Sequence, residues 1–242
     1  MADQKQDDPD IRPTRRHRTL RSVRAHVRPG SFPLLFVATA VNYVLNGFAA
    51  PTAIGKALLV AGHVAVLVAG LYVLSGSRIT VRVGLVMLAA YLGFACGLWR
   101  LDPPTGRVLL DSFVSGYLIG LLGVVLREVF RPSTSERDAV VGALTGFLLI
   151  LSAFMRLHGL IEALSPGAYR ADPALAGRPE AQLIPVFQYF STITLTTVGY
   201  GDIVPVSEAA RLVTGLQAIT GQVYLAVVVA ILVSRVAAAR RD

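Results

Sequence analysis

The residue types able to do chemistry in this 242-residue chain gather in residues 194–202, which read Thr-Leu-Thr-Thr-Val-Gly-Tyr-Gly-Asp. Backbone carbonyl oxygens can replace the water around a desolvated cation if several of them point to one side. An ordinary strand cannot do this, because it alternates its groups between its two sides. Glycine readily adopts the left-handed conformation that would turn alternate carbonyls inward. The segment Thr197, Val198, Gly199, Tyr200 and Gly201 is therefore predicted to form a cation site, with the Thr197 hydroxyl at its inner mouth.

The elements that must position this segment are predicted to be membrane helices. Only 16% of the residues are charged, whereas a soluble domain usually has about 25%. Six apolar blocks, each long enough to cross a bilayer, span residues 31–49, 57–75, 80–99, 108–126, 139–163 and 206–234. Residues 183–196 are too few to span and indicate a re-entrant helix. The predicted fold is an all-α membrane protein with six transmembrane helices and a re-entrant pore helix and filter loop between the fifth and sixth.

The charge of the chain, +8 at pH 7, is distributed as in a membrane protein rather than a nucleic-acid-binding protein. Arginines are concentrated in residues 1–30, after the second and fourth blocks, and at the end of the chain. Basic segments stay on the cytoplasmic side, so both termini are predicted to be cytoplasmic in a multi-pass plasma membrane protein. Residues 1–30 have no apolar stripe and form a predicted mobile tail, for which anionic lipid is the expected partner.

The stretch from the fifth block to the end of the chain resembles the pore module of the potassium channel superfamily. The resemblance is carried by residues 197–202, which follow a short apolar helix and lie between two apolar blocks. It implies two helices around a pore helix and filter, potassium ions as the only bound group, and no other cofactor. Because the chain has one copy of the filter segment, the resemblance implies a homotetramer with four such segments around one axis.

The same resemblance assigns supporting roles to residues beside the filter. Tyr189 and Phe190 stand where many members carry two tryptophans, and they are expected to hold the filter open. Thr196 ends the pore helix, and Asp202 is expected to bind a donor at the outer mouth, for which Tyr189 is the candidate. Ile193 stands where some members carry a glutamate, so that buried carboxylate is absent.

Two glycines of the last block are candidate gating hinges. Gly221 lies where the family has its hinge glycine, and glycine permits a helix to bend. The alternative is that Gly221 allows close helix packing. Gly215 is a second candidate hinge. A lower gate, if present, is predicted to be a ring of apolar side chains within residues 228–233 that closes by losing its water.

The first four blocks, residues 31–137, are predicted to form a helical domain that is separate from the pore domain at 138–242. A voltage sensor needs several intramembrane arginines, but no Lys or Arg lies between Arg107 and Arg127 or between Arg82 and Arg100. Potassium conduction without steep voltage gating is therefore the leading prediction. The alternative is a non-conducting or regulatory subunit whose first four helices act as a sensor. The chain shows no motif typical of an enzyme.

Five polar residues within the blocks receive separate predictions. Arg156 and His158 are expected at the membrane interface, with the arginine reaching to the surface. Glu162 is a candidate brace for the pore loop. Asp111 is expected near the outer end of the fourth block. His63 is interpreted as a hydrogen-bonded structural residue, with pH sensing as the alternative.

Overall fold

The computed structural model describes residues 30–48, 52–73, 78–95, 103–131, 134–171 and 183–239. The tail predicted at residues 1–30 lies outside them, apart from Gly30. The helices are α1 (Phe32–Gly47), α2 (Ala53–Val73), α3 (Arg78–Ala95), α4 (Pro103–Val129), α5 (Glu136–Leu164), α7 (Leu183–Leu195) and α8 (Glu208–Ala239). Strands β1 (Tyr169–Ala171) and β2 (Ile203–Pro205) pair in antiparallel fashion on either side of α7 and the filter segment. Each predicted block therefore coincides with a helix, and the short helix α7 lies where the re-entrant helix was predicted.

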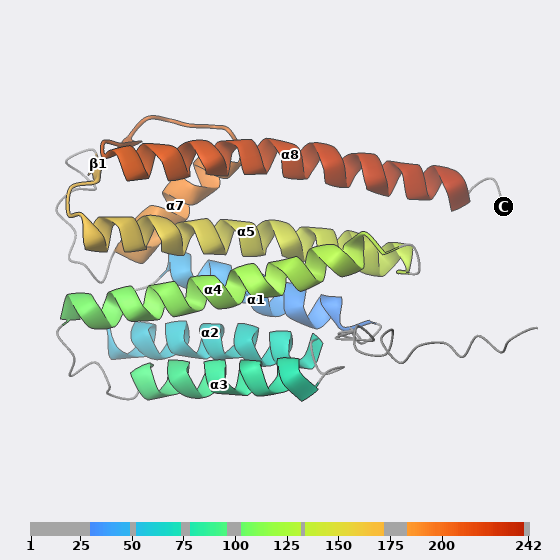
Figure 1. Ribbon diagram of the computed structural model, residues 1–242, viewed down its shortest axis with the longest axis horizontal. Coiled ribbons are helices and arrows are strands. Elements are labelled where there is room, and N and C mark those ends of the chain that lie inside the picture. The colour runs from blue at the N-terminus through green and yellow to red at the C-terminus, as the bar shows by residue number, and fades with distance from the viewer. Residues whose placement is uncertain are drawn as a thin grey trace, which may run out of the picture.

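The long helices lie roughly parallel in layers (Figure 1). Helix α5 lies between α8 and α4, and α2 and α3 lie beyond α4. The core between these layers is apolar and includes the buried side chains of Leu121, Val125 and Leu149. Helix α1 begins and α8 ends at the same end of the bundle. Of the first four helices, α1 and α4 therefore pack directly on the α5 of their own chain.

Three described segments are long and apolar enough to cross a membrane, namely Asp111–Val129, Glu136–Leu164 and Glu208–Ile231. Shorter apolar segments lie at Phe32–Gly47, Ala57–Val73, Val81–Gly93 and Leu183–Leu195. The structure thus supports a helical membrane protein, and the six crossings stay a prediction.

Helix α8 buries one narrow stripe and exposes the rest of its apolar surface. The buried stripe follows the helical repeat and consists of Ala210, Gln217, Gly221, Tyr224 and Val228. Exposed apolar side chains elsewhere on the helix include Leu212, Ile219, Val223, Val229 and Val233. Within the predicted lower gate, Val228 belongs to the core, so only the exposed side chains there could face a pore. An exposed apolar surface of this extent needs lipid or another chain to cover it.

Candidate ion-conducting site

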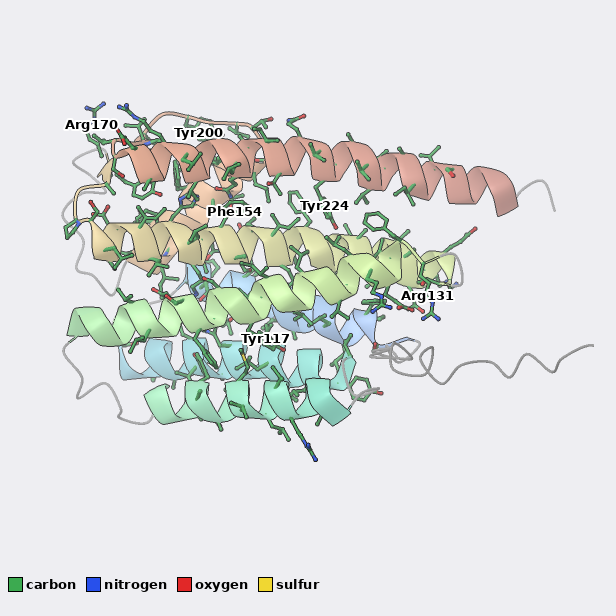
Figure 2. All side chains as sticks on the ribbon, viewed as in Figure 1. Tyr117, Arg131, Phe154, Arg170, Tyr200 and Tyr224 are labelled. Carbon is green, nitrogen blue, oxygen red and sulfur yellow. The ribbon has the colours of Figure 1, made fainter. Side chains whose placement is uncertain are left out.

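The filter segment leaves the end of α7 and runs along α8 on the side away from α5 (Figure 1). Thr196 and Thr197 form a turn directly after Leu195, and residues 198–200 have no regular secondary structure. The side chains of Val198 and Tyr200 are 50% and 72% exposed. Figure 2 shows Tyr200 at the edge of the molecule. The filter segment is therefore an uncovered face of the single chain.

The backbone of the filter segment is left-handed at every second residue. Thr197, Gly199 and Gly201 have φ values of 61°, 53° and 81°. The left-handed conformation predicted for the two glycines is confirmed, and the sequence reasoning missed it at Thr197, where a β-branched residue rarely adopts it. Such alternation allows successive carbonyl groups to face one side, which the predicted cation site requires.

The amide groups of the filter point back toward α7. The N–H groups of Val198 and Gly199 both donate to the Ile193 carbonyl, at 2.8 and 3.2 Å. Ile193 itself is buried. Both N–H groups are therefore hydrogen-bonded behind the filter. The carbonyl oxygens on its open side need not accept from them and stay available to a cation.

The outer mouth of the filter is held by Asp202. Its Oδ2 accepts a 2.6 Å hydrogen bond from the Tyr189 hydroxyl, and its Oδ1 accepts from the Ile203 N–H at 3.1 Å. The contact expected between Asp202 and Tyr189 is therefore present. The hydrogen bond to the Asp202 carboxylate raises the pKa of Tyr189 to about 12, which keeps the hydroxyl protonated and able to donate.

Phe190 lies away from the filter, unlike its neighbour Tyr189. Its ring is buried and meets the rings of His158 and Tyr169 edge-on, with centroids 5.0 and 5.5 Å apart. It therefore supports the filter indirectly, through the packing of α7 against α5 and β1.

A hydrogen-bonded chain behind α7 connects four elements, and the sequence reasoning did not find it. His158 on α5 contacts the Tyr169 hydroxyl of β1 at 2.6 Å and Oε1 of Gln217 on α8 at 2.7 Å. Nε2 of Gln217 donates to the Ser191 carbonyl on α7 at 2.9 Å. His158 is fully buried, so the interfacial location expected for it is wrong. A polar residue such as Gln217 on the buried stripe of α8 was the signal in the sequence.

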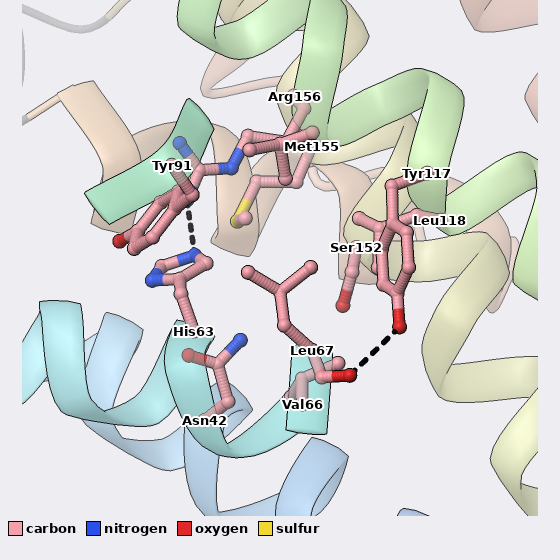
Figure 3. A pocket seen from close by; sticks show the side chains of 11 residues that line it. Asn42, His63, Val66, Leu67, Tyr91, Tyr117, Leu118, Ser152, Met155 and Arg156 are labelled. Carbon is pink, nitrogen blue, oxygen red and sulfur yellow. Dashed lines mark hydrogen bonds between the residues drawn. The ribbon is translucent and has the colours of Figure 1, made fainter. Parts of the chain in front are cut away.

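Arg156 is also buried, contrary to the expectation that it reaches the membrane surface. Its guanidinium pairs with the Asp111 carboxylate of α4 at 2.8 Å. It also contacts Nε2 of His63 on α2 (Figure 3). The helix α4 begins at Pro103, and its candidate membrane span begins at Asp111, so Asp111 lies near one end of the apolar block, as expected. His63 also bonds the Leu59 carbonyl through Nδ1, as the structural interpretation predicted. The Asp111 carboxylate takes the place of water around the Arg156 guanidinium. The arginine side chain can therefore stay inside the protein instead of extending to the membrane surface.

Glu162 braces the segment that follows α5, rather than the filter itself. Its carboxylate accepts from the N–H groups of Gly167 and Tyr169, at 2.8 and 3.2 Å. Because Tyr169 begins β1, which pairs with β2 after the filter, the brace reaches the outer mouth through the sheet.

Helix α1 contacts the pore helix directly. The Tyr43 hydroxyl lies 3.0 Å from Thr192 Oγ1, and Gln188 Nε2 donates to the Tyr43 carbonyl at 2.7 Å. Of the first four helices, α1 therefore reaches the element that carries the filter.

The two hinge candidates have different surroundings. A side chain at Gly221 would collide with the Leu195 carbonyl at the end of α7, whereas nothing lies within 4 Å of the Cβ position at Gly215. The close approach at Gly221 supports the packing interpretation. Helix α8 continues through both positions, and a hinge at either stays a prediction.

Comparison with known proteins points to the same region. The family model described as "Ion channel" matches residues 184–238, from α7 through the filter to α8. The chain is 32% identical over 123 residues to the potassium voltage-gated channel protein shk-1 of Caenorhabditis elegans, covering 50% of this chain and 20% of that protein. It is 35% identical over 104 residues to the voltage-gated potassium channel Kch of Escherichia coli, covering 43% and 22%.

A third relative is the voltage-gated potassium channel KCNC1 of Mus musculus, 30% identical over 116 residues, with 46% of this chain and 20% of the relative covered. The chain thus spans about a fifth of the length of these relatives. No solved structure matches it.

Proposed function

We propose that this chain, which belongs to the potassium channel superfamily, is one subunit of a homotetrameric channel that conducts potassium ions passively. The observation that carries the proposal is the alternating backbone at Thr197, Gly199 and Gly201. A filter built from four such segments would surround a potassium ion with carbonyl oxygens in place of water. The role is that of a channel rather than an enzyme.

The need for four copies is supported by what one chain leaves uncovered. One filter segment provides one wall, and its Val198 and Tyr200 side chains are largely exposed. The apolar outer surface of α8 is exposed beside it. Assembly around one axis would cover both surfaces at once.

The proposed channel crosses the plasma membrane six times and has both termini in the cytoplasm, where anionic lipid binds the basic tail. It is not steeply voltage-gated, because moving one charge through 100 mV yields only about 2.3 kcal/mol and the middle of α4 has no Lys or Arg. The contacts of Tyr43 on α1 with Thr192 and of Asp111 on α4 with Arg156 join the first four helices to the pore domain, and they favour a regulatory role for these helices within a conducting subunit.

The test is a measurement of current through the purified full-length protein in planar bilayers, first with asymmetric KCl and then with NaCl replacing it on one side. The expected current reverses near the potassium equilibrium potential and changes little in open probability with voltage. A current carried equally by sodium would contradict the proposal. So would the absence of current, and of barium binding, in a folded tetramer.

A further inference from the structure

Gln222 is a polar side chain on the exposed surface of α8 that meets the innermost filter residue. Its Nε2 donates to the Thr197 hydroxyl oxygen at 3.3 Å. Both side chains are exposed in the single chain. Neither the sequence reasoning nor the role of the filter carbonyls accounts for this contact.

The surroundings of Gln222 on its own helix are apolar. Successive helical residues are about 100° apart, so side chains three, four, seven and eleven positions away share a face. The neighbours of Gln222 on this face between residues 218 and 233 are Ala218, Ile219, Leu225, Ala226, Val229 and Val233. Between residues 218 and 233, all of which lie in the described part of α8, Gln222 is the one polar side chain on this face.

Thr197 occupies a conformation that needs support. Its φ of 61° is unfavourable for a β-branched residue by about 1–2 kcal/mol. Such a conformation persists where the surroundings fix it. The backbone N–H of Thr197 donates to the Thr194 carbonyl at 3.1 Å, and the Gln222 amide fixes the hydroxyl. Gln222 is thus placed to orient the side-chain oxygen at the inner mouth of the filter.

The side-chain amide of Gln222 also contains an acceptor oxygen, Oε1. Its Nε2 is occupied by Thr197, while Oε1 is an acceptor that can bind a water of hydration or a cation. A neutral amide attracts a cation without holding it by a full charge. Conduction requires this balance, because the ion must be bound well enough to enter and weakly enough to leave.

We infer that Gln222 and Thr197 together form a polar ring at the inner entrance of the filter, where a hydrated monovalent cation is received before it loses its water. The inference rests on the proposed function, since only a tetramer brings four such pairs around one axis. Gln222 acts as a positioning residue for Thr197 and adds its own amide oxygen to the ring. A divalent cation close in size to potassium, such as barium, is the probe for the same site.

Thr220 provides a matched control on the same helix. It lies two residues before Gln222, and its hydroxyl bonds to the Leu216 carbonyl of α8 at 2.7 Å. It lines the apolar groove between α4, α5 and α8, on the other side of the helix from the face that carries Gln222. The substitution Thr220→Val therefore removes one polar group from α8 without changing the proposed ring.

The experiment compares wild type, Gln222→Leu, Gln222→Asn and Thr220→Val in bilayers with barium added on the cytoplasmic side. Gln222→Leu should raise the half-blocking barium concentration roughly tenfold, the loss expected of about one hydrogen bond per site, and lower the single-channel conductance. Gln222→Asn should recover part of both values, and Thr220→Val should match wild type. The reversal potential should stay that of a potassium-selective pore in all four proteins.

Calorimetric titration of the purified tetramers with barium gives a second readout that needs no current. Wild-type barium block and affinity in Gln222→Leu would overturn the inference and leave the proposed function intact. Equal losses in Gln222→Leu and Thr220→Val would also overturn it, because the effect would then belong to α8 in general. A wild-type protein that neither conducts nor binds barium would overturn the proposed function and this inference with it.

Discussion

Arg156 on α5 and Asp111 on α4 form an ion pair in which the two side chains are only 7% and 6% exposed. The pair joins the helix that begins the pore domain to the last of the four preceding helices. His63 of α2 completes the cluster through its contact with the guanidinium. Charged groups inside a membrane are costly unless they are paired, so this cluster fixes how the two parts of the chain pack.

Breaking this pair from one side should destabilise the protein strongly. Asp111→Asn leaves the Arg156 charge buried without its partner, which typically costs about 3–5 kcal/mol. The double variant Asp111→Leu, Arg156→Met should recover most of that loss, because it buries no charge. Thermal unfolding of the detergent-solubilised protein, followed by size-exclusion chromatography after heating, measures both.

The control for this prediction is Arg131→Gln. Arg131 lies 3.6 Å from Glu128, with its side chain 48% exposed, and exposed pairs contribute about 0–1 kcal/mol. The variant should unfold close to wild type. A melting temperature of Asp111→Asn equal to that of Arg131→Gln would contradict the importance of the buried pair.

The hydrogen bond between Tyr189 and Asp202 should stabilise the outer mouth of the filter. Tyr189→Phe removes the donor, and a hydrogen bond to a charged acceptor contributes about 1.5–3 kcal/mol when it is formed well. The variant is expected to lose potassium-over-sodium selectivity first at low external potassium, where fewer ions support the filter. Reversal potentials measured over a range of potassium concentrations test this.

Tyr91→Phe is the comparison variant for that experiment, because it removes a tyrosine hydroxyl from α3 rather than from the pore helix. Its reversal potentials should follow those of wild type at every potassium concentration. The assigned role of the Tyr189 hydroxyl is wrong if both variants behave alike.

The sequence predicted the features that depend on local composition and local geometry. Apolar blocks of the length of a bilayer located the helices, because hydropathy alone determines which segments can enter lipid. Glycines two residues apart predicted the left-handed conformation at Gly199 and Gly201. The match of Tyr189 with Asp202 followed from the family resemblance, and the two residues are only 13 positions apart.

Contacts between distant residues were not predicted. Arg156 and Asp111 are 45 residues apart, and His158 and Gln217 are 59 apart, so no local spacing connects them. Without knowledge of this distant partner, the membrane surface is the expected location for the Arg156 charge. Opposite charges within two apolar blocks were the available signal for a buried pair. The contact of Gln222 with Thr197 was missed for the same reason, because it joins two different elements 25 residues apart.

Replacing glycine by alanine should have opposite effects on stability at Gly221 and at Gly215. Gly221→Ala places a Cβ against the Leu195 carbonyl, and overpacking of this kind typically costs about 1–3 kcal/mol. Gly215→Ala meets nothing within 4 Å and should stabilise α8 by about 0.5–1 kcal/mol. Unfolding temperature and open probability are measured together. If Gly221 serves mainly as a hinge, Gly221→Ala will change open probability while the unfolding temperature stays at the wild-type value.

Gly199 tests whether the left-handed backbone produces selectivity. Gly199→Ala forces an alanine toward φ values near the 53° of the glycine, at a cost of about 1–2 kcal/mol, and the segment should relax so that its carbonyls leave the common side. The potassium-to-sodium permeability ratio should then fall toward one. Gly167→Ala is a matched control, since Gly167 has a φ of 85° and, like Gly199, has no atom within 4 Å of its Cβ position. It lies in the segment after α5 rather than in the filter, so the same backbone strain should lower stability and leave the ratio unchanged. An unchanged permeability ratio in Gly199→Ala would show that selectivity does not depend on this conformation.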